Sequence, residues 1–442
     1  MCSDAGWHLN YGLKGSRSMK RYLYLPKRYD LVVGEPFELF FRGLVNSVSI
    51  DTYDFELSYT DGMNRGTGFH RKYYFVPTEE DLGMHTLCIR LRNNEGEILD
   101  EATCTINVVN PPVSPKEERV VLLMGASDTG PGVWTSELGR MLLGTGGEPA
   151  GHGLENISFI GSRERNGVRY EGYGGWTFLS YLTENKRDDF MNLYGEFSDK
   201  IPAVDQHSSY QDENGQIWKL ETITPTKIKI IRQYYPHPVA LSTEGGRLTH
   251  VSGGQNLGDI VYTSAGRADA NPYWSAELGR NDFRAYAARF GKNKIDEVVV
   301  TLTWNSHAWT REAYEAAMRD FIASVHKDFP ECHITLVGGL FPLRDGFAQN
   351  YGISFAWFPK LEMLRDFDNI RERVASEDPE RLSFVHLASQ YDMDYNGVYA
   401  EFDANIRNPE KVTLGSNGLH IADSGQHQIA DAIYRSICTR LQ

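Results

Sequence analysis

The chain has 442 residues, of which 41% are hydrophobic and 24% charged, as in globular proteins. This length exceeds one ordinary hydrophobic core, so two domains are expected. The formal net charge of −14 argues against a non-specific nucleic-acid binder and against a protein that binds anionic membranes. Because no apolar run approaches the roughly 18 residues of a membrane span, none is predicted.

The cysteines and the N-terminus bear on the cellular compartment. The number of cysteines is odd, 5, and no Cys-x-x-Cys pair occurs, so neither a disulfide framework nor a zinc site is expected. Cys88 and Cys104 lie on neighbouring predicted strands and could bridge, but free thiols are favoured. Residues 1–8 lack the apolar core of a signal peptide, which predicts a cytoplasmic protein if the chain is complete. The alternative is an exported lipoprotein with its signal peptide removed, attached to lipid through Cys2.

Residues 1–115 are predicted to form an N-terminal all-β domain, a small immunoglobulin-like sandwich. Short segments of alternating apolar and polar residues recur at intervals of about ten to fifteen residues, separated by turn residues. The last two segments, Gly83–Arg92 and Ala102–Val109, are expected to pair as a hairpin. The proline-rich, polar segment 111–119 predicts a stiff linker, which places the domain boundary near residue 115.

Residues 116–442 show the strand–helix alternation of an α/β domain, whose parallel sheet is covered by helices on both faces. Five short segments rich in apolar residues are predicted to be its buried strands, at 120–124, 158–160, 297–302, 333–337 and 382–387. Thr310 is a plausible N-cap for a helix with apolar residues at helical spacing, and a last helix is expected over about 425–440.

A β-rich insertion over about residues 190–290 interrupts this alternation. The stretch Asp212-Glu-Asn-Gly215 has part of the spacing of a calcium loop but lacks the other ligands, and Asn-Gly is a common hairpin turn. No metal site is therefore predicted there. We expect the insertion to lie over the carboxyl edge of the parallel sheet, where it would shape a substrate pocket.

Four separated stretches carry residue types suited to ester hydrolysis. They are Gly125-Ala-Ser127-Asp-Thr, Glu171-Gly-Tyr-Gly-Gly175-Trp-Thr, Leu302-Thr-Trp-Asn305-Ser and Asn417-Gly-Leu-His420. Reacting groups of open α/β sheets lie just past the carboxyl ends of strands, so Ser127 is a candidate nucleophile, with helix capping as the alternative. Histidine suits a general base, glycine permits close backbone approach, and an asparagine amide can donate to an oxyanion. Taken singly, Gly175 could be a loop glycine and Asn305 a helix cap.

The order of these stretches resembles the SGNH (GDSL-like) hydrolase family, which includes carbohydrate acetyl esterases, lipases and thioesterases. The resemblance covers about residues 117–442 and implies a three-layer, flavodoxin-like α/β domain. It implies the following site residues: nucleophile Ser127, general base His420, and oxyanion donors from the Ser127 and Gly175 backbone and the Asn305 amide, with Gly174 a close rival for Gly175. The layout, with a β-sandwich ahead of the hydrolase, also resembles uncharacterised two-domain members from gut-type bacteria.

The chain departs from the family pattern close to both catalytic groups. Ala126 and Asn417 stand where the family usually has aspartates, and Thr303 and Ser306 replace the Gly and Asp that usually flank the asparagine. Asn417 is expected to accept a hydrogen bond from the ring of the histidine base, which gives a Ser–His dyad assisted by an amide.

Nearby alternatives to these residues are discounted. Asp128 and Asp423 are expected to be badly placed for orienting the base. His307 lies too near Asn305, and His427 falls inside the last helix.

The sequence therefore predicts a serine-dependent carboxylic-ester hydrolase that deacetylates oligosaccharide or polysaccharide esters without metal or cofactor. Trp176, Trp304 and Trp309 would stack on sugar, and Gly174 would also contact substrate. The alternatives are a catalytically weakened carbohydrate-binding or interaction protein on the same fold, and a lipase or thioesterase. The expected partner is a small-molecule or oligosaccharide ester rather than nucleic acid. Acyl length, sugar identity and oligomeric state stay open.

Overall fold

The structure is a computed structural model that describes residues 22–47, 49–184, 193–196, 208–213, 215, 217–224, 227–232, 245–253, 256, 258–262, 264–267, 271–302, 305–306, 310–341, 343–346 and 357–442. Several residues named above lie outside these ranges: residues 1–8, Asn214, Thr303, Trp304, His307 and Trp309. In the described ranges no helix is long and apolar enough to cross a membrane. Cys88 and Cys104 are free thiols, as favoured from the sequence.

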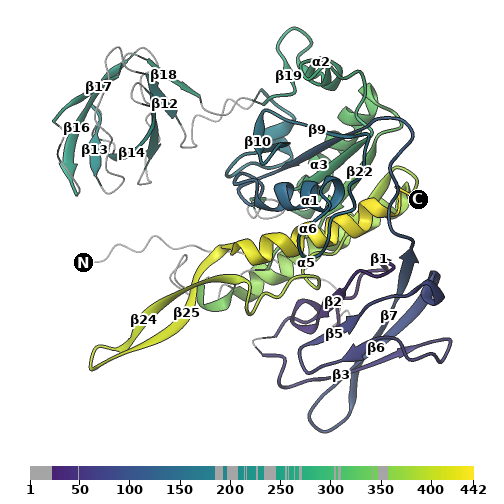
Figure 1. The fold of residues 1–442 in the computed structure, drawn as a ribbon. Coiled ribbons are helices and arrows are strands. Elements are labelled where there is room, and N and C mark those ends of the chain that lie inside the picture. Colours follow the sequence, from purple (N-terminus) through teal and green to yellow (C-terminus); the bar gives the residue numbers. More distant parts are fainter. Residues whose placement is uncertain are drawn as a thin grey trace.

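The N-terminal region contains two β-sheets around one apolar core (Figure 1). The larger sheet has the order β1 (Arg28–Val32), β7 (Ile98–Val109), β6 (Gly83–Arg92) and β3 (Asp54–Tyr59), and the smaller one has β2 (Phe37–Phe40), β5 (Lys72–Phe75) and β4 (Thr67–Gly68). The short helices η1 (Phe41–Leu44) and η2 (Glu79–Asp81) follow β2 and β5. The antiparallel pairing of β6 with β7 confirms the predicted hairpin.

The α/β domain is built around β8 (Arg119–Gly125). On one side β8 pairs with β21 (Glu297–Thr301), followed by β22 (His333–Val337) and β23 (Leu382–Val385), all parallel. On its other side lie β9 (Ile157–Ile160) along its first half and β11 (Val168–Gly172) along its last residues, also parallel, and the short β10 (Arg163–Arg165) pairs with β11. Counted from β8, with β9 as the second strand, the order is 2-1-3-4-5, so the chain reverses direction across the sheet between β8 and β21. Such a switch point is where open α/β sheets bind ligands.

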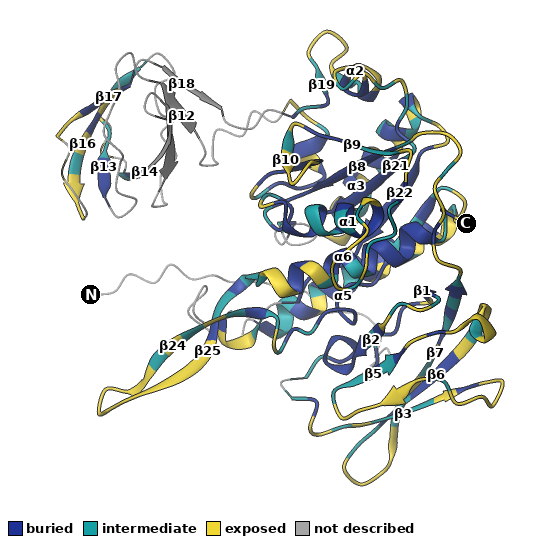
Figure 2. Ribbon diagram, in the orientation of Figure 1, coloured by how far each residue is buried: buried dark blue, intermediate teal, exposed yellow. Residues whose placement is uncertain are grey.

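Both faces of β8 are buried, as its unbroken apolar run predicts. Val121 and Leu123 belong to the apolar cluster with α1 (Val133–Leu143) and α6 (Asp423–Cys438). Val120, Leu122 and Met124 belong to the opposite cluster, with α2 (Phe283–Ala288) and α3 (Arg311–Asp328). The long helix α5 (Trp357–Glu377) contributes to both. Figure 2 shows the central strands β8, β21 and β22 as buried.

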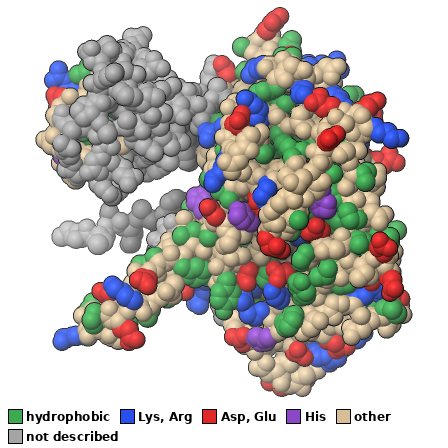
Figure 3. Space-filling view, in the orientation of Figure 1, with side chains coloured by type: hydrophobic (Ala, Val, Ile, Leu, Met, Phe, Trp, Pro, Cys, Tyr) green, Lys and Arg blue, Asp and Glu red, His purple; other side chains and the backbone are tan. Residues whose placement is uncertain are grey.

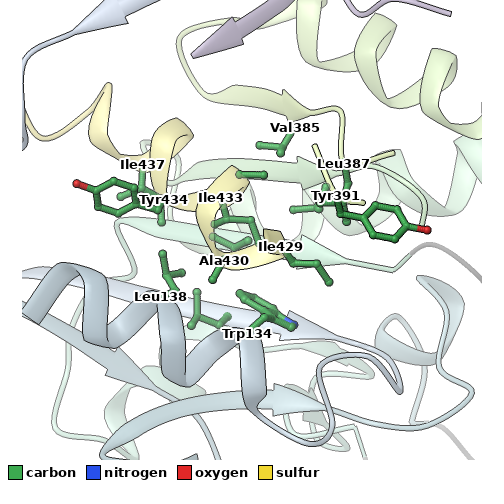
Figure 4. Close-up of a cluster of buried hydrophobic side chains, with 14 of the residues drawn as sticks. Trp134, Leu138, Val385, Leu387, Tyr391, Ile429, Ala430, Ile433, Tyr434 and Ile437 are labelled. Atoms are coloured by element: carbon green, nitrogen blue, oxygen red, sulfur yellow. The ribbon is translucent and has the colours of Figure 1, made fainter. Parts of the chain in front are cut away.

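Helices α1 and α6 pack directly on one another. Figure 4 shows Trp134 and Leu138 of α1 pointing toward Ile429, Ala430 and Ile433 of α6. Helix α1 follows the Ser127 turn and α6 follows His420, so the packing of these two helices connects the segments that carry the two predicted dyad residues. On the opposite face, Thr310 caps α3 as predicted, accepting a hydrogen bond of 3.2 Å from the Ala313 N–H.

The insertion forms a sheet of its own. Its strands run in the order β17 (Ile260–Tyr262), β16 (Gly246–Ser252), β13 (Ser209–Gln211), β14 (Ile217–Thr224), β15 (Lys227–Arg232), β12 (Leu193–Glu196) and β18 (Ser264–Arg267). The short pair β19 (Trp274–Ser275) and β20 (Arg280–Asn281) leads back to α2. Figure 1 shows the seven-stranded sheet standing apart from the α/β domain, so the expected position over its carboxyl edge is wrong. Trp218 and Leu248, both buried, belong to the insertion, and a sheet of three or more strands with its own apolar face can be stable by itself.

A long hairpin, unpredicted from the sequence, lies between β23 and α6. It consists of β24 (Gly397–Asn405) and β25 (Asn408–Ile421) and is called the arm below. In Figures 1 and 3 the arm extends away from the body of the molecule. Its outer half is exposed (Figure 2), and Ile406 at its tip is 100% exposed.

The N-terminal region packs against the segment that connects β23 to the arm. Tyr29 and Ser389 share a hydrogen bond of 2.7 Å between their hydroxyls, and the Phe40 N–H donates to the Ser389 carbonyl at 2.8 Å. Gly43 lies so close that a Cβ there would be 1.9 Å from the Ala388 carbonyl oxygen. The N-terminal region therefore braces the segment that leads into the arm.

Candidate active site

The first three chemical stretches emerge side by side at the carboxyl edge of the sheet. Gly125, at the end of β8, is in register with Gly172 on β11 and with Thr301 on β21. Each strand then runs on for a few residues, to Ser127, Gly175 and Asn305 respectively. The switch point therefore brings together the predicted nucleophile and both predicted oxyanion residues.

Hydrogen bonds fix the turn that carries Ser127. The N–H groups of Thr129 and Gly130 donate to the Ala126 carbonyl at 3.1 and 2.9 Å. The Thr129 hydroxyl bonds the Thr301 hydroxyl at 2.6 Å and accepts from the Trp134 indole at 3.2 Å. Ser127 itself is half-buried, so the turn is rigid beneath it while its own surface stays partly open.

Gly125 is required beneath this turn. A Cβ at Gly125 would lie 2.0 Å from the Thr301 hydroxyl oxygen and 2.1 Å from that of Thr129. We expect Gly125→Ala to lower the free energy of unfolding by about 1–3 kcal/mol through overpacking, measured by urea denaturation. Gly146→Ala is the matched control, because a Cβ at Gly146 meets nothing within 4 Å. Equal unfolding midpoints for the two variants would contradict the proposed steric role.

The glycine stretch forms a tight turn. The Trp176 N–H donates to the Tyr173 carbonyl at 3.3 Å, which makes Tyr173–Trp176 a β-turn, and Gly175 at its third position has φ +79°. A positive φ at this position is the requirement of type II turns and favours glycine. Gly174 occupies the second position and is exposed.

A buried carboxylate to which the sequence assigns no role holds this stretch in place. Glu171 is fully buried and accepts hydrogen bonds from Tyr173 at 2.5 Å and from Tyr286 at 2.6 Å. The backbone N–H and hydroxyl of Ser162 also donate to it, both at 2.7 Å. With these four donors, and no ion pair among the described residues, Glu171 positions the glycine turn.

Trp176 differs from its predicted role. It is only 5% exposed and packs against Tyr173 and Tyr181, with ring centroids 4.3 and 4.6 Å away. A ring enclosed in this way cannot stack on sugar, so the prediction of a substrate-binding Trp176 is wrong. The Trp176 carbonyl accepts a hydrogen bond of 3.1 Å from the Asn305 side-chain amide. This bond connects the glycine stretch to the asparagine stretch.

His420 lies on a bulge at the base of the arm. Val398 pairs with Asn417 and the adjacent Gly397 pairs with Ile421, so three residues of β25, Gly418 to His420, loop out between the two pairs. The chain returns directly into α6 at Asp423. The histidine stretch is thus the end of a strand, and His420 is half-buried.

Asn417 shapes this bulge rather than orienting the histidine ring. Its side-chain oxygen accepts hydrogen bonds from the Leu419 N–H at 2.8 Å and the His420 N–H at 3.0 Å. These two donors use both lone pairs of a carbonyl oxygen. The structure therefore corrects the expectation that this oxygen accepts from the imidazole.

Asp128, directly after the candidate nucleophile, is buried. Its carboxyl group is 6% exposed, and burial raises its pKa to about 6, while the charge of His420 opposes that rise. The residue after the nucleophile is thus within electrostatic range of the predicted base. Asp423 is exposed, as is His427 on α6. In the described ranges no group of three His, Cys, Asp or Glu residues could hold a metal ion.

No family model matches the chain, and no curated protein matches it. Among solved structures it is similar to a family 3 carbohydrate esterase from Clostridium thermocellum, with 12% identity over 74% of this chain and 99% of that one, at a TM-score of 0.34. It is also similar to a family 2 carbohydrate esterase with a carbohydrate binding domain from Corynascus thermopiles (Myceliophthora fergusii), with 11% identity over 95% and 99%, TM-score 0.33.

A third similar structure is a putative GDSL-like lipase from Bacteroides ovatus, with 10% identity over 92% of this chain and 82% of that chain, at a TM-score of 0.31. The solved structures thus include carbohydrate esterases and GDSL-like lipases.

Proposed function

We propose that the chain is a serine-dependent carboxylic-ester hydrolase that removes acetyl groups from carbohydrate esters. One observation carries the proposal: the strand register brings the Ser127, Gly175 and Asn305 stretches together at the switch point of the sheet. The acetylated-carbohydrate substrate rests on the resemblance of the four stretches alone, since Trp176 is buried.

In the proposed reaction the Ser127 hydroxyl oxygen attacks the acyl carbon, and His420 takes the hydroxyl proton. The carbonyl oxygen becomes an oxyanion, which the backbone N–H groups of Ser127 and Gly175 stabilise. Asn305 supplies a third donor, because its amide has two N–H groups and Trp176 uses one of them.

Collapse of this intermediate breaks the ester bond, and the leaving sugar hydroxyl receives the proton from His420. Water then attacks the acyl-enzyme with His420 again as base, and acetate and the free Ser127 hydroxyl are formed. Asn417 contributes by holding the bulge that presents His420, through its two backbone hydrogen bonds.

Covalent trapping tests the nucleophile. Incubation with diethyl p-nitrophenyl phosphate, which phosphorylates activated serines, is expected to leave one adduct, located on Ser127 by peptide mass spectrometry. Loss of acetate release from acetylated xylo-oligosaccharides should follow the same time course as adduct formation. Full acetate release after complete labelling of Ser127, or loss of acetate release while Ser127 stays unlabelled, would rule out Ser127 as the nucleophile.

A second candidate function is carbohydrate binding without turnover, favoured by the commitment of the Asn417 oxygen to the backbone. Isothermal titration with deacetylated oligosaccharides, together with an absence of ester hydrolysis, would support this candidate. The lipase and thioesterase alternatives are separated by a chain-length series: p-nitrophenyl acetate should be hydrolysed faster than the butyrate or octanoate if the acetyl ester is preferred.

A further inference from the structure

A hollow on the surface of helix α1 takes no part in the reaction proposed above. It has a volume of about 580 Å³ and is lined by α1, by the first two turns of α6 and by the turn between β10 and β11. Its polar lining includes Glu137, Arg140, Arg165, Asp423 and His427, and it is called the α1 basin below. Helix α1 packs against both α6 and the β10–β11 hairpin (Figure 1). The volume is within the range of ligand sites, about 300–1,000 Å³.

The β10–β11 hairpin is held firmly against the basin. Arg165 pairs with Val168 across a turn of two residues. These residues, Asn166 and Gly167, have φ +51° and +79°, and two positive φ angles are the requirement of a tight type I′ turn. The hairpin also lies so close to α1 that a Cβ at Gly139 would be 2.2 Å from Val168 Cγ2. Close packing therefore sets the shape of the basin, as in a pre-formed ligand site.

The charges that line the basin balance one another. Two guanidinium nitrogens of Arg140 donate to the two carboxylate oxygens of Glu137, at 2.8 and 2.6 Å, so this pair is neutral as a whole. Arg165 and Asp423 have opposite charges, are exposed, and form no ion pair among the described residues. With His427 neutral, the basin has no net charge, although the chain has a formal net charge of −14. A neutral ligand therefore fits the basin better than a strongly charged one.

The polar groups in the basin suit a ligand that has many hydroxyl groups. Arg165 donates from one guanidinium nitrogen to the Pro131 carbonyl at 2.9 Å, and its other N–H groups remain for a ligand. The Asp423 carboxylate accepts hydrogen bonds, and a neutral His427 ring has one donor and one acceptor. Because a sugar hydroxyl both donates and accepts, these groups match successive hydroxyls of a saccharide. An acyl chain would instead remove water from charged side chains without replacing its hydrogen bonds, which is unfavourable.

The basin lies close to both residues of the proposed dyad. Asp423 is three residues from His420, so their Cα atoms are at most about 11 Å apart. Pro131, which binds Arg165 through its carbonyl, is four residues from Ser127, so these two Cα atoms are at most about 15 Å apart. A short oligosaccharide with its ester at Ser127 can therefore extend into the basin.

We propose that the α1 basin binds the sugar chain of the substrate, a neutral oligosaccharide whose hydroxyl groups hydrogen-bond to Arg165, Asp423 and His427. This inference rests on the proposed function, since that function places the ester at Ser127. The basin then has the sugar-binding role that the sequence predicted for Trp176. The proposal concerns binding alone, so no bond forms or breaks in the basin.

The first test compares Asp423→Ala with Ser424→Ala, because Ser424 is exposed on the same turn of α6 but does not line the basin. With acetylated xylotriose, Asp423→Ala is expected to raise KM about tenfold or more, the effect of losing a hydrogen bond to a charged group, while Ser424→Ala should not. With p-nitrophenyl acetate, which has no sugar, both variants should stay within about twofold of the wild type. An equal loss on both substrates would mean that the substitution acts through His420 and would overturn the proposal, as would an unchanged KM for xylotriose.

The length of the sugar chain gives a readout that a purely structural role would not move. In the wild type, kcat/KM should rise from acetylated xylose to acetylated xylotriose, because the longer chain reaches more of the basin. Arg165→Gln, on the hairpin side of the basin, should reduce this rise about tenfold and leave the rate on p-nitrophenyl acetate unchanged. A wild-type protein that is equally active on the two acetylated sugars contradicts the proposal.

Binding is also measurable without turnover. Isothermal titration of Ser127→Ala with deacetylated xylohexaose should show binding, which Asp423→Ala in the same background weakens about tenfold. Trigalacturonate should bind more weakly, since the basin has no net positive charge; tighter binding of this acidic sugar, or no binding of xylohexaose, overturns the proposal. Failure of the proposed function is distinguishable, because Ser127→Ala would then keep the esterase activity. Failure of this inference alone leaves Ser127→Ala inactive and the titration unaffected by Asp423→Ala.

Discussion

Replacing Ser127 with alanine is expected to lower kcat for p-nitrophenyl acetate by about four orders of magnitude or more, because the substitution removes the atom that bonds to the acyl carbon. A residual rate above that in buffer should remain, since the oxyanion donors do not depend on the hydroxyl. KM should change little, because no other contact is altered. Steady-state kinetics with spectrophotometric detection of p-nitrophenol measures both constants.

The control for this substitution is Ser136→Ala, which removes a hydroxyl from the half-buried face of α1. Ser136 accepts a hydrogen bond of 2.8 Å from the Asn166 side chain and has no part in the proposed reaction, so the variant should keep the wild-type rate. If Ser127→Ala hydrolyses the ester within tenfold of Ser136→Ala, the hydroxyl of Ser127 is not the nucleophile. Matching circular dichroism spectra would show that the comparison is between folded proteins.

The second large effect concerns stability. Glu297, on the central strand β21, is fully buried between Arg119, at 3.0 Å, and Arg440. Glu297→Gln would leave two guanidinium groups without their carboxylate, and breaking a buried ion pair in this way costs about 3–5 kcal/mol. We expect a loss of that size in the free energy of unfolding at pH 7, measured by urea denaturation.

The loss should depend on pH with a defined sign. Burial alone would raise the pKa of Glu297, but Arg440 and Arg119 outweigh it and hold the pKa near 2, below its usual value of about 4.3. The stabilisation is therefore complete above the unfolded-state value and fades as the pH falls toward 2. Glu155→Gln, at an exposed position, should change stability by less than about 0.5 kcal/mol. A deficit for Glu297→Gln that stays constant from pH 7 to pH 3 would contradict this account.

The parallel sheet could be predicted from the sequence because its strands are buried on both faces. The uninterrupted apolar run 120–124 is typical of such a strand, and Thr310 marks a helix start by its capping side chain. The arm gave no such signal. In its outer half the residues on both faces are exposed or half-buried, so apolar and polar residues need not alternate cleanly. The position of the insertion is a matter of tertiary packing, which local patterns do not contain.

The candidate site, like the fold, has one part that could be predicted from the sequence and one part that could not. Ser127, Gly175 and Asn305 could be brought together in advance, because the carboxyl ends of neighbouring parallel strands must meet at one edge. The directions in which individual side chains point could not be predicted from the sequence. The spacing of Asn417 from the histidine is compatible with two roles, orienting the histidine ring or accepting from the backbone of its own bulge. Whether the Trp176 ring can stack on a sugar or belongs to the core depends on its burial, which the sequence does not give.

The arm has two parts with different tolerance to change. The base of the proposed reaction is held between the pairs Val398–Asn417 and Gly397–Ile421, so this inner end acts as a clamp on the bulge. Beyond Val398 the strands pair mainly with each other, as far as Asn405 and Asn408. The outer arm can therefore be shortened, lengthened or replaced by a tag or a foreign binding loop without loosening the clamp, which gives the protein a natural place for grafting close to its chemistry.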